Sequence, residues 1–267
     1  MAVAPSLWVD GRPASLEDLA HQALVNYGAF TSFRVEAGGV RGLDLHLARL
    51  EAEARAVFGE AVSETALRNS IRTALAGRPD AWLRISLFAP EISNRDPRWV
   101  GRPRVMVGVF DSPASLAGGV RVQSQLYERE VAELKHVATF GLLRARRAAG
   151  QAGFDDALFV DRDGRISEGT LWNVGFVQGD AIVWPLASML DGVAQRLIRA
   201  GLAAASVPQR TEAVRLPDLI HFDGAFLCNS ATPAAEIADI DGHGFSGATA
   251  MIGQVAQAWR SQPCQTI

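Results

Sequence analysis

The chain has 267 residues, enough to bury a substantial core in one large domain or in two smaller ones. Its hydrophobic content of 48% and charged content of 21% are those of an ordinary globular protein. A formal net charge of -3 argues against nucleic acid or an anionic membrane as the main partner.

Residues that are few or widely spaced exclude several kinds of site. The two cysteines, Cys228 and Cys264, make no disulfide framework, and the five histidines show no metal-ligand spacing, so we expect no metal site. No run of about 18 apolar residues is present to span a bilayer. The first ten residues lack a charged start followed by an apolar run, so we expect no signal peptide and a cytoplasmic protein.

The first part of the chain is predicted to combine short strands with amphipathic helices. The helix at 43–58 has the clearest pattern, because Leu47, Leu50 and Ala54 recur on one face. Its charged residues mostly lie off that stripe: Arg49, Glu51, Glu53 and Arg55. Strands are expected at 7–9, 27–35, around Val40, at 81–88 and at 104–110, and further helices at 15–23 and 63–76.

A polar loop at 90–103 separates the last two of these strands. It contains three arginines and is long enough to line a site. The segment 111–119, with the sequence DSPASLAGG, is the best candidate for a linker. It divides a small N-terminal α/β domain at 1–110 from a larger C-terminal domain at 120–267.

The second part also mixes strands and helices, and two of its turns carry hairpin signals. Because strands and helices do not alternate strictly, a doubly wound parallel sheet is disfavoured and we expect an α+β fold. Strands are expected at 120–126, 157–160, 165–166, 172–177, 181–184 and 225–228, and helices at 140–149, 192–205 and 247–259.

Lys135 is the only lysine of the chain, and the other 25 basic residues are all arginine. A guanidinium keeps its proton at neutral pH, whereas a desolvated lysine amine can lose its proton and form a Schiff base with a carbonyl. One lysine among so many arginines therefore indicates a position at which amine chemistry is required. The alternative is an arbitrary surface lysine left by drift in composition.

Four short motifs, one of which contains this lysine, carry a family resemblance. They are His46-Leu47-Ala48-Arg49-Leu50, Leu134-Lys135-His136, Ile166-Ser167-Glu168-Gly169-Thr170-Leu171-Trp172-Asn173 and Leu190-Asp191-Gly192-Val193, with a weaker fifth at Asn229-Ser230-Ala231. In their order and spacing, from Val9 to Gly242, the chain resembles the class IV aminotransferases, the pyridoxal phosphate enzymes of fold type IV. That family includes branched-chain and D-amino acid aminotransferases and aminodeoxychorismate lyase. The resemblance implies a homodimer of two-domain subunits, with a small α/β N-terminal domain and a larger C-terminal domain that contains a mixed, β-barrel-like sheet.

The resemblance also assigns the main cofactor-binding residues. Lys135 matches the family's Schiff-base lysine, which also moves the α-proton of the substrate. Glu168 matches the acid beneath the pyridine nitrogen, which keeps the ring protonated, although a glutamate beside a glycine can also cap a turn. Arg49 matches the arginine that grips the cofactor phosphate, and the alternative for it is the solvated side of its helix.

Two further segments match the family's phosphate-binding backbone. Val193 and Ala194 lie where a helix N-terminus offers N–H groups to the phosphate. The sequence departs from the family there, because a threonine is usual at Ala194 and an arginine at Gln195. Ser230 and Ala231 match a second phosphate loop, through the side chain and the backbone respectively.

Substrate contacts are less well specified by the sequence. Tyr27, Phe30 and Thr31 lie where the small domain of the family faces the cofactor. Arg95 and Arg98 of the polar loop are candidates for binding a substrate carboxylate, although arginines in such loops are commonly just solvated.

These assignments predict a PLP-dependent aminotransferase that moves an amino group between two small molecules, an amino acid or amine and a 2-oxo acid. Two alternatives stay open: a lyase of the aminodeoxychorismate type, which eliminates pyruvate, and a non-catalytic PLP-binding relative. Phe140 stands where branched-chain aminotransferases usually place a tyrosine, which puts a branched-chain substrate in doubt. Neither nucleic acid nor a membrane is expected as a partner.

Overall fold

A computed structural model describes residues 6–245 and 247–267 of the chain. Residues 1–5, on which part of the signal-peptide prediction rests, lie outside the described residues. In the part that is described, no helix combines the length and the apolar character needed to cross a bilayer.

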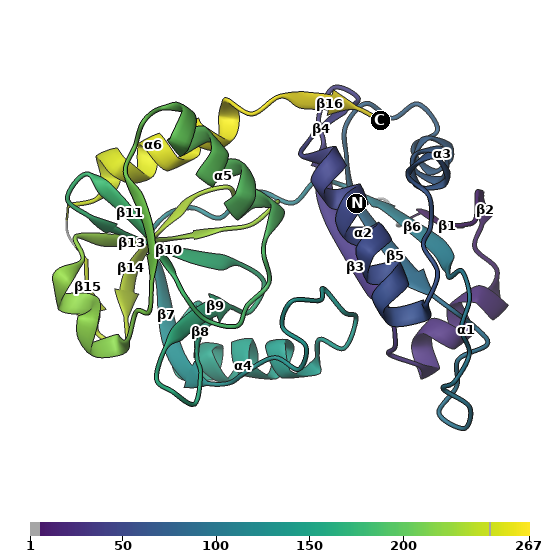
Figure 1. Cartoon of the computed structure of the whole chain (residues 1–267), viewed down its shortest axis with the longest axis horizontal. Coiled ribbons are helices and arrows are strands. Elements are labelled where there is room, and N and C mark those ends of the chain that lie inside the picture. Colours follow the sequence, from purple (N-terminus) through teal and green to yellow (C-terminus); the bar gives the residue numbers. More distant parts are fainter. Residues whose placement is uncertain (1–5, 246) are drawn as a thin grey trace. The chain divides into compact units, whose positions relative to one another are not determined.

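The described residues form two compact units (Figure 1). The first unit contains the chain up to Ala114 together with Leu134–Ala138 and Cys264–Ile267. The second contains Ser115–Glu133 and Thr139–Pro263. The chain therefore returns to the first unit twice, and Lys135 belongs to that unit although the segments before Leu134 and after Ala138 belong to the second.

The first unit is built on a five-stranded antiparallel sheet in the order β2-β1-β6-β5-β3. On β5, Leu83, Ile85 and Leu87 are fully buried, as expected when one face of a strand packs on a core. They share that core with α2 (Leu43–Phe58) and α3 (Glu64–Leu75). The strands are β1 (Ser6–Val9), β2 (Arg12–Pro13), β3 (Ala29–Val35), β5 (Ala81–Phe88) and β6 (Arg104–Phe110).

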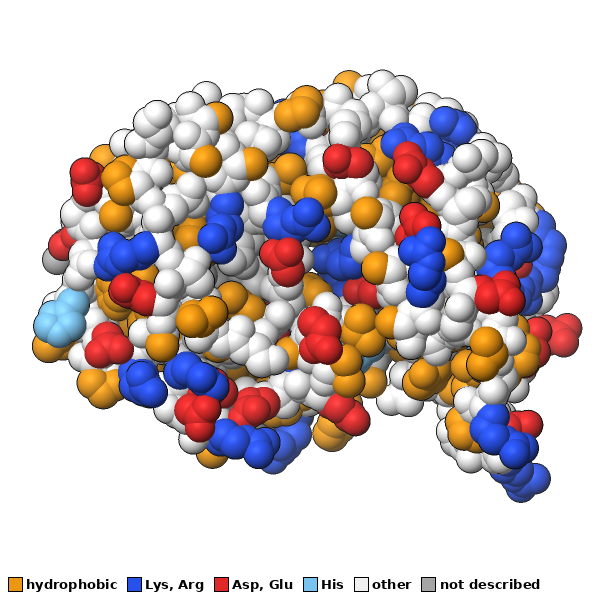
Figure 2. Space-filling model, in the orientation of Figure 1, with side chains coloured by type: hydrophobic (Ala, Val, Ile, Leu, Met, Phe, Trp, Pro, Cys, Tyr) orange, Lys and Arg blue, Asp and Glu red, His pale blue; other side chains and the backbone are white. Residues whose placement is uncertain are grey.

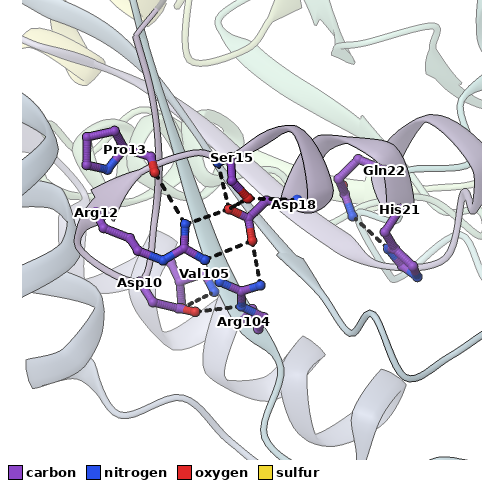
Figure 3. Close-up of polar contacts among 9 residues, drawn as sticks. All are labelled: Asp10, Arg12, Pro13, Ser15, Asp18, His21, Gln22, Arg104 and Val105. Atoms are coloured by element: carbon purple, nitrogen blue, oxygen red, sulfur yellow. Dashed lines mark hydrogen bonds and ion pairs between the residues drawn. The ribbon is translucent and has the colours of Figure 1, made fainter.

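Asp18 fixes α1 (Leu16–Leu24) to this sheet. It is 2% exposed and accepts hydrogen bonds from the guanidinium groups of Arg12 and Arg104, as Figure 3 shows. It also completes a capping box with Ser15 at the start of the helix. The Arg12 hydrogen bond is the largest of the contacts that hold the Asp18 pKa well below its usual range. One carboxylate thus ties β2, α1 and β6 together.

The helix predicted at 43–58 is confirmed at both ends. Its buried face is wider than the predicted stripe, because Glu53 is only 2% exposed. Glu53 is therefore the exception among the four charged residues predicted to lie mostly off the apolar stripe. The physical reason is a tertiary contact, since Glu53 Oε1 accepts the backbone N–H of Lys135 at 2.7 Å.

The second unit contains a closed barrel of six strands, in agreement with the predicted barrel-like sheet. The strands follow the order β10-β13-β14-β7-β8-β9, and β9 pairs with β10 to close the ring. The pairs β14–β7 and β7–β8 are parallel and the other four are antiparallel, so the sheet is mixed. The strands are β7 (Val120–Leu126), β8 (Asp156–Val160), β9 (Ile166–Gly169), β10 (Asn173–Gln178), β13 (Gly224–Cys228) and β14 (Ala235–Ile240).

Alternate residues of the barrel strands serve two cores. On β13, Ala225 and Leu227 join one apolar cluster, whereas Phe226 and Cys228 join a second that includes residues of α5 (Val193–Ala204) and α6 (Thr249–Arg260). This period of two places the helices outside the ring. The helix α4 (Phe140–Gln151) packs in the same way against β8.

Several short strands were missing from the sequence prediction. On β14, a register shift between Ile237 and Asp239 breaks the alternation that marks a strand. The strand at Gln209–Glu212 was also omitted, because it contains no apolar residue and pairs with only one strand at the edge of the sheet. The prediction omitted β2, β4 (Gly39–Arg41) beyond its centre, β12 (Gln209–Glu212), β14, β15 (His243–Gly244), β16 (Cys264–Thr266) and the 3₁₀ helix η1 (Leu216–His221). The strand β11 (Ala181–Pro185) was expected.

Charged side chains of both signs are interspersed on the face that Figure 2 shows. Ion pairs one helical turn apart join Arg55 with Glu51 and Arg68 with Glu64.

Candidate active site

The lysine segment, residues 134–138, is held in the first unit by its main chain. The C=O of Lys135 accepts the N–H of Phe30 at 2.9 Å, and the N–H of Val137 donates to Gly28 O at 2.9 Å. The N–H of Lys135 donates to the carboxylate of Glu53. Both backbone polar groups of Lys135 are therefore fixed by residues that are distant in sequence.

Gly28 explains why this approach is possible. Its φ is +158°, and a Cβ there would lie 2.3 Å from Leu87 O, so the position accepts only glycine without rearrangement. The strand predicted from residue 27 accordingly begins at Ala29. Tyr27, a predicted substrate residue, is half exposed and its hydroxyl donates to Val57 O.

The side chain of Lys135 lies beside Phe30. Nζ is 4.8 Å from the centre of the Phe30 ring. The Arg84 guanidinium lies 3.7 Å from the centre of the same ring. Phe30 itself is buried, so one ring contacts the cations of two long side chains.

Arg84 is a residue that the sequence analysis missed. It lines a cavity of about 260 Å³ within the first unit, together with Gln22, Asn26, Ser86 and Val137 of the lysine segment. Burial lowers the pKa of its guanidinium, and no carboxylate in the described part of the chain forms an ion pair with it. The cavity lining is mixed, since it also includes Leu7, Val25, Met106 and Phe110. A half-buried cation beside such a cavity is available to an anionic ligand. The only sign of Arg84 in the sequence is that one arginine interrupts a mostly apolar strand.

Arg49, Thr31 and His46 form a hydrogen-bonded group near the lysine. Arg49 donates to Thr31 Oγ1 at 2.6 Å, and that oxygen lies 2.7 Å from His46 Nδ1. Burial, and then the charges of Arg49 and Lys135, hold the pKa of His46 well below its usual value, so its imidazole is neutral at pH 7. Thr31 is fully buried. Its surroundings support a role in holding Arg49 rather than the predicted contact with substrate.

Glu168 lies at the end of β9 in the second unit and is paired with Arg129. The two side chains are 8% and 7% exposed and approach to 2.8 Å, and Arg129 also donates to Ala132 O. The other carboxylate oxygen of Glu168 accepts the N–H of Leu190 at 3.3 Å. Glu168 is therefore a buried, fixed acid and not the exposed turn cap considered as its alternative.

Asn173 joins Glu168 to the start of α5. It lies opposite Glu168 in the β9–β10 pair and donates to Leu190 O at 2.8 Å. A Cβ on Gly192 would lie 2.0 Å from Asn173 Oδ1, so the chain passes this amide closely just before the helix. The acid and the helix N-terminus are thus fixed to each other through adjacent strands.

The N-terminus of α5 has no side-chain cap. Gly192 is its N-cap residue, and Val193 and Ala194 supply no side-chain acceptor in the first turn. Gln195 follows and is buried. Backbone N–H groups at an uncapped N-terminus suit an anion such as phosphate.

The loop that contains Ser230 and Ala231 is folded around Asn229. The Asn229 side-chain oxygen accepts the N–H groups of Ala231 and Thr232, at 2.9 and 2.7 Å. Ala231 O in turn accepts the hydroxyl of Ser115. The predicted phosphate donor at the Ala231 backbone is therefore engaged within the loop, whereas no such bond involves the Ser230 side chain among the described residues.

The other predicted residues lie in exposed positions. Arg95 is exposed in the polar loop, and Arg98 is 87% exposed and paired with Asp96. Phe140, the first residue of α4, is 78% exposed. Most of the Phe140 side chain therefore lies outside the core of the second unit.

The fold and these residues define a class of protein. A closed mixed barrel, a unit with an antiparallel sheet and a main-chain-fixed lysine are the features of a fold type IV PLP enzyme. The solved structure of the branched-chain amino acid aminotransferase from Escherichia coli has this fold, with a TM-score of 0.84 at 18% identity over 97% of this chain and 94% of that one. A putative 4-amino-4-deoxychorismate lyase from Legionella pneumophila gives a TM-score of 0.80 at 18% identity over 93% and 95%.

The sequence comparisons identify the family. The family model described as amino-transferase class IV matches residues 28–240. A probable branched-chain-amino-acid aminotransferase of Rickettsia felis is 22% identical over 254 residues, 88% of this chain and 87% of its own length. A putative one of Methanocaldococcus jannaschii is 24% identical over 254 residues, 88% and 86%. The chain belongs to the class IV aminotransferase family, as predicted; it is an enzyme of that family, whose cofactor is pyridoxal phosphate.

Proposed function

We propose that this chain transfers an amino group between an amino acid or amine and a 2-oxo acid, with Lys135 as its Schiff-base lysine. One observation carries this proposal: the only lysine has both backbone polar groups hydrogen-bonded, and its Nζ is 4.8 Å from the centre of the Phe30 ring. An arbitrary surface lysine needs no such fixation. A lysine whose amine must react with a carbonyl in one geometry requires a fixed backbone.

The donor and acceptor groups of the chain fit pyridoxal phosphate. A buried carboxylate at Glu168 suits a protonated ring nitrogen, and the uncapped N-terminus of α5 suits the phosphate. The loss of a threonine hydroxyl at Ala194 leaves the backbone N–H groups in place. The residues present are therefore sufficient to hold the group.

Bound pyridoxal phosphate supplies an electron sink for negative charge at the substrate α-carbon. The chain supplies the remaining functions. Lys135 Nζ would accept and return the α-proton of the substrate, for which its amine must be neutral. Arg129, paired with Glu168 at 2.8 Å, would keep that carboxylate in place for the ring nitrogen. The family resemblance assigns Arg49, Val193, Ala194 and Ser230 as the residues that would hold the phosphate.

We assign the binding of a substrate carboxylate to Arg84. Its guanidinium has no acidic partner among the described residues and contacts the ring beside which Lys135 Nζ lies. Arg95 and Arg98 are weaker candidates, because solvent already satisfies them. The curated relatives are named for branched-chain amino acids, so these amino acids are the first substrates to test.

The test is the visible absorption of the purified protein with PLP. We expect a yellow protein whose absorption changes when an amino donor is added, and a Lys135→Ala variant that lacks both. A wild-type protein that stays colourless with PLP would refute the proposal. A panel of amino donors, scored by the spectral change, then identifies the substrate.

The same protein separates transfer from elimination. Transfer requires a 2-oxo acid acceptor, whereas a lyase releases pyruvate from an aminodeoxychorismate-like substrate without one. The names of the curated relatives favour transfer.

We retain three further proposals. The resemblance implies a homodimer, the sequence of the first ten residues suggests a cytoplasmic location, and the composition of 111–119 suggests the linker between the domains. Light scattering after size-exclusion chromatography tests the first, with a mass of one subunit, 28.6 kDa, as the contrary result.

A further inference from the structure

A buried carboxylate contacts the lysine segment from α2. Glu53 is 2% exposed, and its Oε1 accepts the backbone N–H of Lys135 at 2.7 Å. Burying a carboxylate costs several kcal/mol unless hydrogen bonds compensate it. The 2.7 Å hydrogen bond from the Lys135 N–H supplies part of that compensation. Glu53 therefore contributes a constraint at the one lysine of the chain.

This bond fixes the backbone on one side of the Lys135 Cα. On the other side, the Lys135 C=O accepts the N–H of Phe30 at 2.9 Å. Since both flanking peptide groups are fixed, the direction of the Cα–Cβ bond is fixed as well, and with it the region that the amine can reach. Only five residues, 134–138, belong to the first unit here, so no helix or long strand holds the lysine in their place.

We propose that Glu53 is a positioning residue for Lys135, acting through the main chain and not through contact with the substrate; this inference rests on the proposed function of Lys135. Without the Glu53 carboxylate, the Lys135 peptide loses one of its two anchors and the amine moves. A misplacement of about 1 Å at a reacting group costs on the order of 100-fold in rate. The loss falls on kcat, because Glu53 contributes nothing to the binding of substrate.

The experiment compares Glu53→Ala, Glu53→Gln and a control, Glu51→Ala. Glu51 lies on the same helix, where it forms an ion pair with Arg55 at the surface. Glutamine keeps an acceptor oxygen at the same distance from the main chain of residue 53, so it distinguishes the effect of losing the hydrogen bond from the effect of losing the negative charge. The two readouts are hydrogen exchange at the Lys135 amide in the protein without cofactor, and kcat and KM of the PLP-loaded enzyme.

For Glu53→Ala we expect amide exchange at Lys135 at least about tenfold faster and kcat about 100-fold lower, with KM changed less than about threefold. Glu53→Gln is expected to restore slow exchange and most of kcat, and Glu51→Ala to match the wild type. Unchanged exchange or unchanged kcat in Glu53→Ala overturns the inference. If the alanine variant does not fold, Glu53→Asp decides, because its carboxylate is one methylene shorter: faster exchange at the Lys135 amide supports the inference, and unchanged exchange overturns it. A wild-type protein without PLP-dependent activity refutes the proposed function instead, and the exchange experiment still tests the anchor.

Discussion

Replacing Arg84 by methionine should separate stability from catalysis. The Arg84 guanidinium is half buried, its pKa is lowered by that burial, and it has no acidic partner in the described residues. Methionine has a similar length and no charge to desolvate. The substitution therefore removes the guanidinium that is proposed to bind the substrate carboxylate, and it leaves no unpaired charge at that position.

The magnitude follows from the two contacts of Arg84. Loss of a charge-assisted hydrogen bond to a substrate carboxylate costs about 1.5–3 kcal/mol, which lowers kcat/KM about 10- to 100-fold. Loss of the contact with the Phe30 ring costs about 1 kcal/mol of stability, and relief of the desolvated charge offsets it. We therefore expect a change in the free energy of unfolding of about 1 kcal/mol or less.

The assay measures kcat/KM with a series of 2-oxo acids and the free energy of unfolding in urea. The matched control is Arg34→Met. Arg34 lies two residues from Ser32, the β3 partner of Arg84, and so it projects from the same face of the sheet. It differs in being paired with Glu36 and in donating to Pro113 O. It should lose little activity.

Two results would refute this reasoning. One is a value of kcat/KM within about twofold of the wild type with every acceptor. The other is a loss of stability as large as the loss of transition-state binding, which would make Arg84 a structural residue.

Three further changes test the second unit and the anchoring of α1. Glu168→Gln should lower kcat about 100-fold or more at unchanged fold, because an amide does not stabilise a protonated ring nitrogen; circular dichroism is the control. Gly192→Ala should cost about 1–3 kcal/mol and weaken PLP binding, since its Cβ would lie 2.0 Å from Asn173 Oδ1; an unchanged PLP titration would count against the assigned role. Because the pKa of Asp18 is lower in the folded state, the ionised Asp18 contributes its full stabilisation above about pH 4, and this contribution is lost progressively at lower pH. In the Asp18→Asn variant, the midpoint temperature of unfolding should therefore fall less steeply as the pH is lowered below about 4.

Much of the fold was predictable because its signals are local. The helix at 43–58 has an uninterrupted apolar period, and the strands β5 and β6 are apolar runs between turns. The strand β14 was not predictable, because its partners β13 and β7 come from separate parts of the chain and a register shift interrupts its pattern. Strand pairing of this kind is decided by the neighbours and not by the segment itself.

The candidate site divides in the same way. Composition alone indicated Lys135, since one amine among 25 arginines is a chemical distinction that needs no coordinates. The surroundings of that amine could not be predicted from the sequence. Glu53 has the sequence position of a polar helix residue, and only the tertiary structure shows that it is buried and accepts a hydrogen bond from the segment 134–138.

The sequence by itself therefore determined the family, the reactive amine and most of the elements, because each depends on residue type and on short-range order. Only the tertiary structure decided which groups meet the lysine. The Glu53 carboxylate accepts its backbone N–H, the Phe30 ring faces its amine, and Arg84 lies against the same ring. These contacts join residues tens of positions apart in the chain, and the burial that gives them their strength exists only after the sheet and helices have packed.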